Sequence, residues 1–136
     1  MSTILVGYVP TPEGRAALQR GIEEATLRDA RLLVVNSHRG GTSFDRGEAI
    51  ASAAELSDVE AELRASGVDF EVRGLVRGQE VSDDLVAVAA DEGAQLIVIG
   101  LRRRSPVGKL ILGSNAQRIL LDAGCPVLAV KAAPES

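Results

Sequence analysis

Continuous apolar runs alternate along the chain with stretches whose apolar residues recur at helical spacing. Five short runs are rich in β-branched residues: Thr3–Tyr8, Leu32–Asn36, Phe70–Val76, Leu96–Gly100 and Pro126–Lys131. Most of them are apolar at successive positions, which is typical of strands covered on both faces of a sheet. The third run instead alternates, with Phe70 and Val72 on one side, and this favours a strand nearer an edge.

Helical patterns fill the gaps between these runs. The expected N-caps are Thr11, which precedes Pro12, and further along Ser82 and Ser114. Glycines close three of the four predicted helices: Gly67, Gly93 and Gly124. The predicted buried stripes are, helix by helix, Ala17, Leu18, Ile22 and Ala25; Ala49, Ala53, Leu56, Val59 and Leu63; Leu85, Val88 and Ala89; and Ile119, Leu120 and Ala123.

This alternation of strands and helices predicts one α/β domain over residues 1–136, with a doubly wound, five-stranded parallel sheet. The expected strand order is 3-2-1-4-5, so the direction of winding reverses between the first and fourth strands. Ligands of such sheets bind beyond the carboxyl ends of the strands at this reversal. Two segments, Val9–Thr11 and Leu101–Gly113, are therefore expected to border a site.

Composition and charge exclude several classes of protein. Aromatic residues make up 2% of the 136 residues and the net charge is −4, which argues against nucleic-acid binding. The apolar runs are far shorter than the roughly 20 residues of a membrane helix, and the first residues lack the features of a signal peptide, so a cytoplasmic protein is expected. The single cysteine, Cys125, excludes an internal disulfide and a cysteine-rich zinc site, and no metal site is predicted. A small buried hydrophobe is its expected role.

The familiar catalytic and cofactor motifs are missing. The sequence contains no G-x-G-x-x-G and no G-x-S-x-G, and Gly108-Lys109 is not followed by the Ser or Thr of a phosphate-binding loop. The single histidine, His38, is expected in an exposed loop rather than in a catalytic triad. Carboxylates lie where helix surfaces and caps favour them. We therefore predict no catalytic residue.

The segment after the fourth strand has two interpretations. Gly113, Ser114 and Asn115 open the last helix, whose free N–H groups and positive dipole end favour an anion. Four cations precede them and could clamp a polyphosphate: Arg102, Arg103, Arg104 and Lys109. The alternative is an ordinary helix start beside a solvated run of charge. The residues alone favour neither.

Over nearly its full length the sequence resembles the single-domain universal stress proteins. The resemblance rests on TILVGYV at the start and is strongest in LIVIGLRRRSPVGKLILGSNAQRILLDAGCPVLAVK, Leu96–Lys131. It implies a Rossmann-like fold of the adenine nucleotide alpha hydrolase type and a homodimer. It also implies membership of either an ATP-binding or a non-binding branch of the family.

Three positions depart from the pattern of the ATP-binding branch. That branch carries G-x2-G-x9-G-[ST] after the fourth strand, and here Arg103 replaces the second glycine. Val9 stands where binders have an acidic residue that holds adenosine, and Asn36 stands where a valine backbone often meets adenine. The resemblance thus implies a site for ATP or another adenine nucleotide, with Mg²⁺, formed by Val9, Asn36, Val76, Gly100, Arg103, Gly113, Ser114 and Asn115.

Two functions follow from these observations. The first is a nucleotide-responsive stress protein with at most slow ATP hydrolysis. The second is a module that binds no nucleotide and acts through a homodimer. The family's habit of pairing the last strand with its symmetry mate places that interface on Pro126, Val127, Leu128, Ala129 and Val130.

Overall fold

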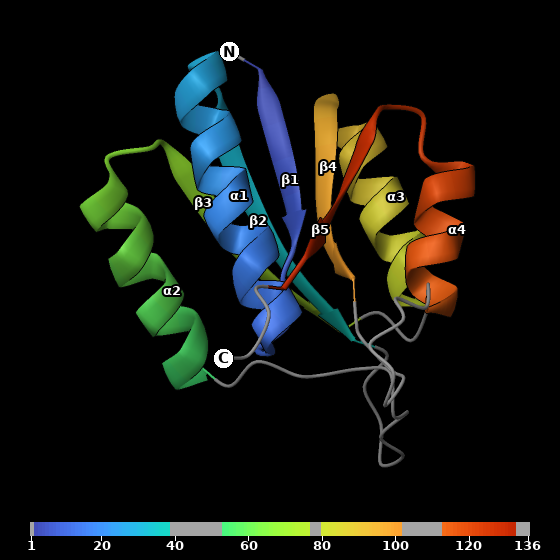
Figure 1. Ribbon diagram of the computed structural model, residues 1–136, viewed down its shortest axis with the longest axis horizontal. Helices are drawn as coiled ribbons and strands as arrows, with labels where there is room; N and C mark the ends of the chain where they lie inside the picture. The colour runs from blue at the N-terminus through green and yellow to red at the C-terminus, as the bar shows by residue number, and fades with distance from the viewer. Residues whose placement is uncertain (1, 39–52, 77–79, 102–112, 133–136) are drawn as a thin grey trace.

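The computed structural model describes residues 2–38, 53–76, 80–101 and 113–132. Strands and helices alternate through these ranges (Figure 1). The strands are β1 (Thr3–Gly7), β2 (Arg31–His38), β3 (Phe70–Val76), β4 (Ala94–Leu101) and β5 (Val127–Lys131). The helices are α1 (Pro12–Arg28), α2 (Ala53–Ser66), α3 (Val81–Asp91) and α4 (Ser114–Asp122). The predicted order of elements is confirmed.

The five strands form one parallel sheet in the order β3-β2-β1-β4-β5, as the sequence predicts. Central β1 sets the register: Val6 pairs with Val34 of β2 on one side and with Val98 of β4 on the other. Helices α1 and α2 cover one face, while α3 and α4 cover the other. The winding therefore reverses between β1 and β4.

Successive residues of the central strands enter two separate apolar clusters. In β1, Ile4 and Val6 pack beneath α1 and α2, while Leu5 packs beneath α3 and α4. All three have no exposed surface. This arrangement explains why these strands are apolar at every position, because side chains on both faces are buried. At the edge, Phe70 and Val72 of β3 contact only the first cluster, which agrees with the alternation in that strand.

One of the three predicted N-caps is confirmed. The backbone N–H of Gly14 donates to Thr11 Oγ1 at 3.2 Å, and α1 begins at Pro12. The other two predictions are wrong. Ser82 lies inside α3, which has Glu80 at its N-cap, and Ser114 is the first residue of α4, with Gly113 at its N-cap. A capping side chain contributes only about 1 kcal/mol, so the packing of the apolar face decides where each of these helices begins.

Several boundaries and exposures also differ from the prediction. β2 extends to His38, which is thus the last residue of a strand and not part of a loop. In α4, Leu120 is 40% exposed instead of buried. Ile119 is the residue of this helix that the structure shows as buried. In α2, Ala53 is exposed, and Ala49 lies outside the described residues.

Candidate functional site

The carboxyl ends of the strands share one edge of the sheet, and helices α1, α3 and α4 begin there (Figure 1). β1 and β4 are neighbours at this edge, and the helices that follow them, α1 and α4, pack on opposite faces. This is the position at which an open parallel sheet offers a ligand crevice. Predicted site residues follow or end β1, β2, β3 and β4, so the topology brings them to the same edge.

The turn that leaves β1 lies directly against the end of β4. The N–H of Thr11 donates to the Val9 carbonyl at 2.8 Å, which makes a tight turn into α1. A Cβ on Gly100 would lie only 2.2 Å from the carbonyl oxygen of Glu13 in the first turn of α1. Val9 and Gly100 thus both lie against the first turn of α1, Val9 at Gly14 and Gly100 at Glu13. Position 100 requires a glycine, because the backbone of α1 passes over it and leaves no room for a side chain.

Among the described residues, the start of α4 lacks the groups that usually satisfy a helix N-terminus. Gly113 at its N-cap offers no side chain, and no acidic residue lies in its first turn. Ser114 is exposed, Asn115 is half-buried, and a Cβ on Gly113 would meet no atom of the described residues within 4 Å. The first N–H groups of α4 and the positive end of its dipole therefore suit an anion. Arg103, predicted to clamp phosphate, lies outside the described residues, as do Arg102, Arg104 and Lys109.

Asn36 supports the backbone at the end of β1. Its side chain is 1% exposed, and its Nδ2 donates to the carbonyl oxygen of Tyr8 at 2.8 Å. The N–H of Tyr8 in turn donates to the Val35 carbonyl at 2.9 Å. Val76 ends β3 opposite His38, at the same edge but on the strand farthest from β4.

Sequence reasoning missed a buried polar pair at this edge. The hydroxyl of Ser37 in β2 donates to Asp84 Oδ2 in the first turns of α3 at 2.6 Å. Asp84 has no exposed surface, so the expectation that the carboxylates lie on helix surfaces and at caps is wrong for this residue. The available signal for its burial was its position four residues before Val88, on the same face of the predicted helix as the buried stripe. Asp84 Oδ1 and Ser82 Oγ are buried without a hydrogen-bond partner.

The starts of α3 and α4 are also joined on the surface. Arg118 of α4 approaches Asp83 of α3 at 3.9 Å, and both side chains are about half exposed. Neither group is desolvated, so the ion pair adds little to stability.

Cys125 is partly buried against the cluster beneath α3 and α4. Burial raises the pKa of its thiol above the ordinary value of 9.0. At neutral pH the sulfur is therefore protonated, which does not favour a nucleophilic role. Across the residues that the structure describes, no three His, Cys, Asp or Glu side chains are grouped to hold a metal ion.

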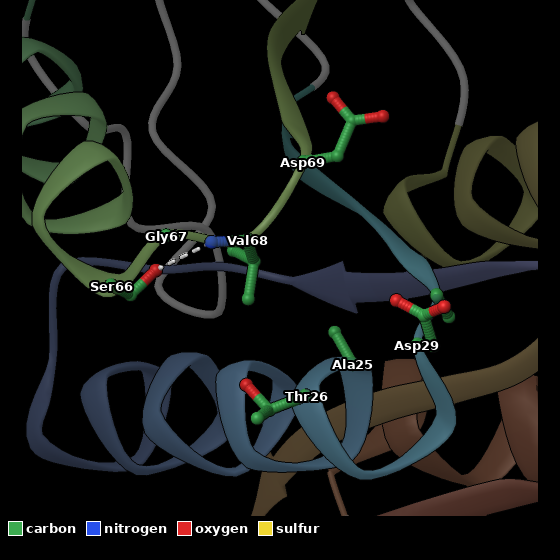
Figure 2. Close-up of a pocket in the computed structure, with 8 residues that line it drawn as sticks. Ala25, Thr26, Asp29, Ser66, Gly67, Val68 and Asp69 are labelled. Carbon is green, nitrogen blue, oxygen red and sulfur yellow. Dashed lines mark hydrogen bonds between the residues drawn. The ribbon is translucent and has the colours of Figure 1, made fainter.

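A pocket of about 290 Å³ lies at the opposite edge of the sheet (Figure 2). The last turn of α1 and the turn between α2 and β3 line it, with Asp29 and Asp69 among the contributing residues. Both carboxylates are exposed, and both helices end at this pocket. The negative ends of two helix dipoles and two acidic side chains make it unsuited to a phosphate. This pocket is therefore not a candidate for binding an anion.

Helices in the described ranges are too short or too polar to cross a lipid bilayer.

The model of the universal stress protein family matches residues 1–131 of the chain. The chain belongs to the universal stress protein family. A universal stress protein of Mycolicibacterium smegmatis is 50% identical over 128 residues, which are 94% of this chain and 96% of that protein.

Solved structures of universal stress proteins share the fold. One from Archaeoglobus fulgidus superimposes with a TM-score of 0.79 at 37% identity, over 96% of this chain and 98% of that one. A structure of the universal stress protein from Archaeoglobus fulgidus in complex with dAMP gives a TM-score of 0.74 at 31% identity, with the same coverage of 96% and 98%. The predicted family and its Rossmann-like fold are confirmed.

Proposed function

We propose that this universal stress protein binds ATP or a related adenine nucleotide, with Mg²⁺, and acts as a regulatory protein in a stress response without strong catalysis. The observation that carries the proposal is the start of α4, which has no capping side chain among the described residues and lies beside the reversal of winding. The dAMP complex of a relative that is 31% identical supports an adenine nucleotide as the ligand.

The phosphates are assigned to the amino terminus of α4. Backbone N–H groups of Ser114 and Asn115 would donate to them, and the exposed hydroxyl of Ser114 would add a further hydrogen bond. Gly113 has no side chain, and a Cβ there would meet no atom of the described residues within 4 Å, which favours the close approach of a phosphate oxygen. Arg103 is assigned as a clamp on the same group, and Mg²⁺ would be carried on the phosphate oxygens.

The nucleoside is assigned to the ends of β1, β2 and β3, at Val9, Asn36 and Val76, with Gly100 at the end of the neighbouring strand β4. A valine cannot accept a hydrogen bond from ribose through its side chain. Losing one charge-assisted hydrogen bond weakens binding by about 1–3 kcal/mol, which is about one to two decades in affinity. Affinity for ATP is therefore expected to be modest.

The catalytic part of the proposal is limited to slow hydrolysis. Asp84, the carboxylate buried at this edge, lies at the end of β2, while the phosphates are assigned beyond β4, on the other side of β1. A general base must lie within hydrogen-bond reach of the attacking water, and Asp84 is too far from the phosphates to meet this condition. Binding is therefore assigned a regulatory role, in which an occupied crevice changes the surface seen by partners.

The direct test is to denature the purified protein and separate any released small molecules by ion-exchange chromatography. An adenine nucleotide approaching one equivalent supports the proposal. The same preparation of the Ser114→Ala variant should release less, because it has lost one donor to the phosphates. Native protein that releases no nucleotide, and takes none up from millimolar ATP, contradicts the proposal.

The edge strand β5 favours a second function, that of a homodimeric interaction module. Among the described strands β5 pairs only with β4, and its other edge is open. Val127, Leu128, Ala129 and Val130 are half-buried, so apolar surface remains along an unpaired strand. A second copy of this chain, paired through Pro126–Val130, would cover it. This function is compatible with nucleotide binding.

A further inference from the structure

One oxygen of a fully buried carboxylate has no hydrogen-bond partner in the part of the chain that the structure describes. Asp84 Oδ2 accepts from the Ser37 hydroxyl at 2.6 Å, but Asp84 Oδ1 has no partner, although the residue has no exposed surface. Buried polar atoms are satisfied in the great majority of cases, and an exception calls for a physical explanation. A group that arrives with a ligand would supply the missing donor.

Asp84 lies at the edge of the sheet where the nucleotide is proposed to bind. Its partner Ser37 is the penultimate residue of β2, and the adjacent Leu85 packs over the end of β1. A Cβ on Gly7 would lie 3.0 Å from Leu85 Cδ1, which fixes how closely α3 approaches that strand. The carboxylate thus lies at the end of β2, one strand from β1.

The order of the strands decides which part of a nucleotide would reach this position. Neighbouring strands are about 4.8 Å apart, so the ends of β4 and β2, separated by β1, are roughly 10 Å apart. With the phosphates at the start of α4, after β4, the ribose falls over the end of β1 and the base over the end of β2. This placement rests on the proposed function.

We propose that Asp84 is a specificity-determining residue that accepts a hydrogen bond from the exocyclic amine of the bound base. The oxygens of a carboxylate accept hydrogen bonds. Adenine presents an amino donor at the position where hypoxanthine presents a carbonyl oxygen, so this acceptor attracts the first base and repels the second. Because water is excluded from this position, both the attraction to adenine and the repulsion of hypoxanthine are stronger than they would be in solvent. Because the carboxylate has no exposed surface, the edge of the base must enter the corner between β2 and α3 to meet it.

The test compares the affinities of ATP and inosine triphosphate, which differ at this one group of the base. We expect the native protein to prefer ATP by about 10- to 100-fold, the range for a hydrogen bond to a charged group. In Asp84→Asn the preference should fall to within about threefold or reverse, because the new amide can donate to the carbonyl of hypoxanthine. Asp83→Asn is the matched control: its side chain is 53% exposed, and its removal should leave the native ratio unchanged.

A second variant separates base recognition from a structural role. Ser37→Ala removes the donor to Oδ2 but leaves the carboxylate in place, so it should lower stability and keep the preference for ATP. Thermal unfolding of each variant shows whether it is folded at the temperature of the titration. If Asp84→Asn does not fold, the native ratio decides, and equal affinities for the two nucleotides overturn the proposal.

The two proposals fail in different ways. Native protein that binds neither nucleotide overturns both. Native protein that binds ATP, with a ratio that Asp84→Asn does not change, overturns the role of Asp84 and leaves nucleotide binding intact.

Discussion

Gly100 of β4 passes directly beneath Glu13 of α1, at a separation that leaves no room for a side chain. A Cβ on Gly100 would lie 2.2 Å from the Glu13 carbonyl oxygen and 2.6 Å from its carbonyl carbon. Both atoms belong to the backbone of the helix and cannot turn aside. This contact holds the first turn of α1 against the end of β4.

Gly100→Ala should therefore destabilise the protein. Crowding of this kind costs about 1–3 kcal/mol, and here the helix itself must shift. Urea unfolding followed by circular dichroism measures the change. Gly124→Ala is the control, since a Cβ there would have nothing within 4 Å, and its effect should be no larger than about 0.5 kcal/mol. Equal stabilities of the two variants would show that α1 does not press on β4 as described.

Ser37→Ala should also lower the free energy of unfolding. The substitution removes the donor to Asp84 and leaves a fully buried carboxylate with neither oxygen paired. Hydrogen bonds to charged groups contribute about 1.5–3 kcal/mol, and a loss in this range is expected from urea unfolding at pH 7. The control is Ser57→Ala on the exposed face of α2, which should change stability by less than about 0.5 kcal/mol. A native-like Ser37→Ala would mean that the hydrogen bond has no net effect.

Partly exposed charged side chains form a network where β2, β3 and the end of α3 meet. Arg73 donates to Glu71 within β3 and, at 2.6 Å, to Glu92 after α3, while Arg31 of β2 also contacts Glu71. The hydrogen bond from Arg73 lowers the pKa of Glu71 below its ordinary 4.5. Burial opposes this effect, and the charges of Arg73 and Arg31 add to it. The hydrogen bonds from Arg73 to Glu71 and Glu92 also raise the pKa of Arg73.

This network predicts a specific loss of stability in acid. Because the pKa of Glu71 is lower in the folded state than in the unfolded state, its contribution is present above about pH 4.5 and is lost as the pH falls through the folded value. In Arg73→Gln the decline of unfolding free energy below pH 4.5 should be shallower than in the native protein. Urea midpoints measured between about pH 3 and 7 provide the comparison. The control is Arg64→Gln, which removes an exposed ion pair with Glu60 and should retain the native dependence of unfolding free energy on pH. Parallel curves for the native protein and Arg73→Gln would contradict the role given to Arg73.

The open edge of β5 predicts a dimer that forms with or without nucleotide. Val127 is half-buried beside β4, in register with Ile97. Lysine at this position places a charge on the paired edge, where two symmetry-related copies repel, so Val127→Lys should be monomeric. Sedimentation velocity distinguishes the two states. A native chain that sediments as a monomer at tens of micromolar would rule out the interface.

Most of the fold could be predicted because burial on both faces leaves a strong pattern. Val34 and Val98 belong to runs that are apolar at every position, and both are fully buried beside β1. Helix starts were harder to predict. Serine favours an N-cap by about 1 kcal/mol, and the packing of Leu85 and Ile119 outweighs that preference, so Ser82 lies within α3 and Ser114 begins α4.

The candidate site was predicted less completely than the fold. Strand order alone predicted that the chain leaves β1 beside the end of β4, because the ends of neighbouring parallel strands coincide. Ser37 and Asp84 are 47 residues apart, and nothing local to either residue indicates the other. The two residues meet because of the way α3 lies across β2. This is a tertiary arrangement, and the spacing of residues along the helix does not predict it.

The most direct test of adenine nucleotide binding at the start of α4 is an isothermal titration of the native protein with ATP and Mg²⁺. We predict saturable heat with a stoichiometry near one, and a loss of affinity of about fivefold in Ser114→Ala, for one hydrogen bond of roughly 1 kcal/mol. The absence of heat at millimolar ATP would contradict the account, as would an affinity that Ser114→Ala leaves unchanged.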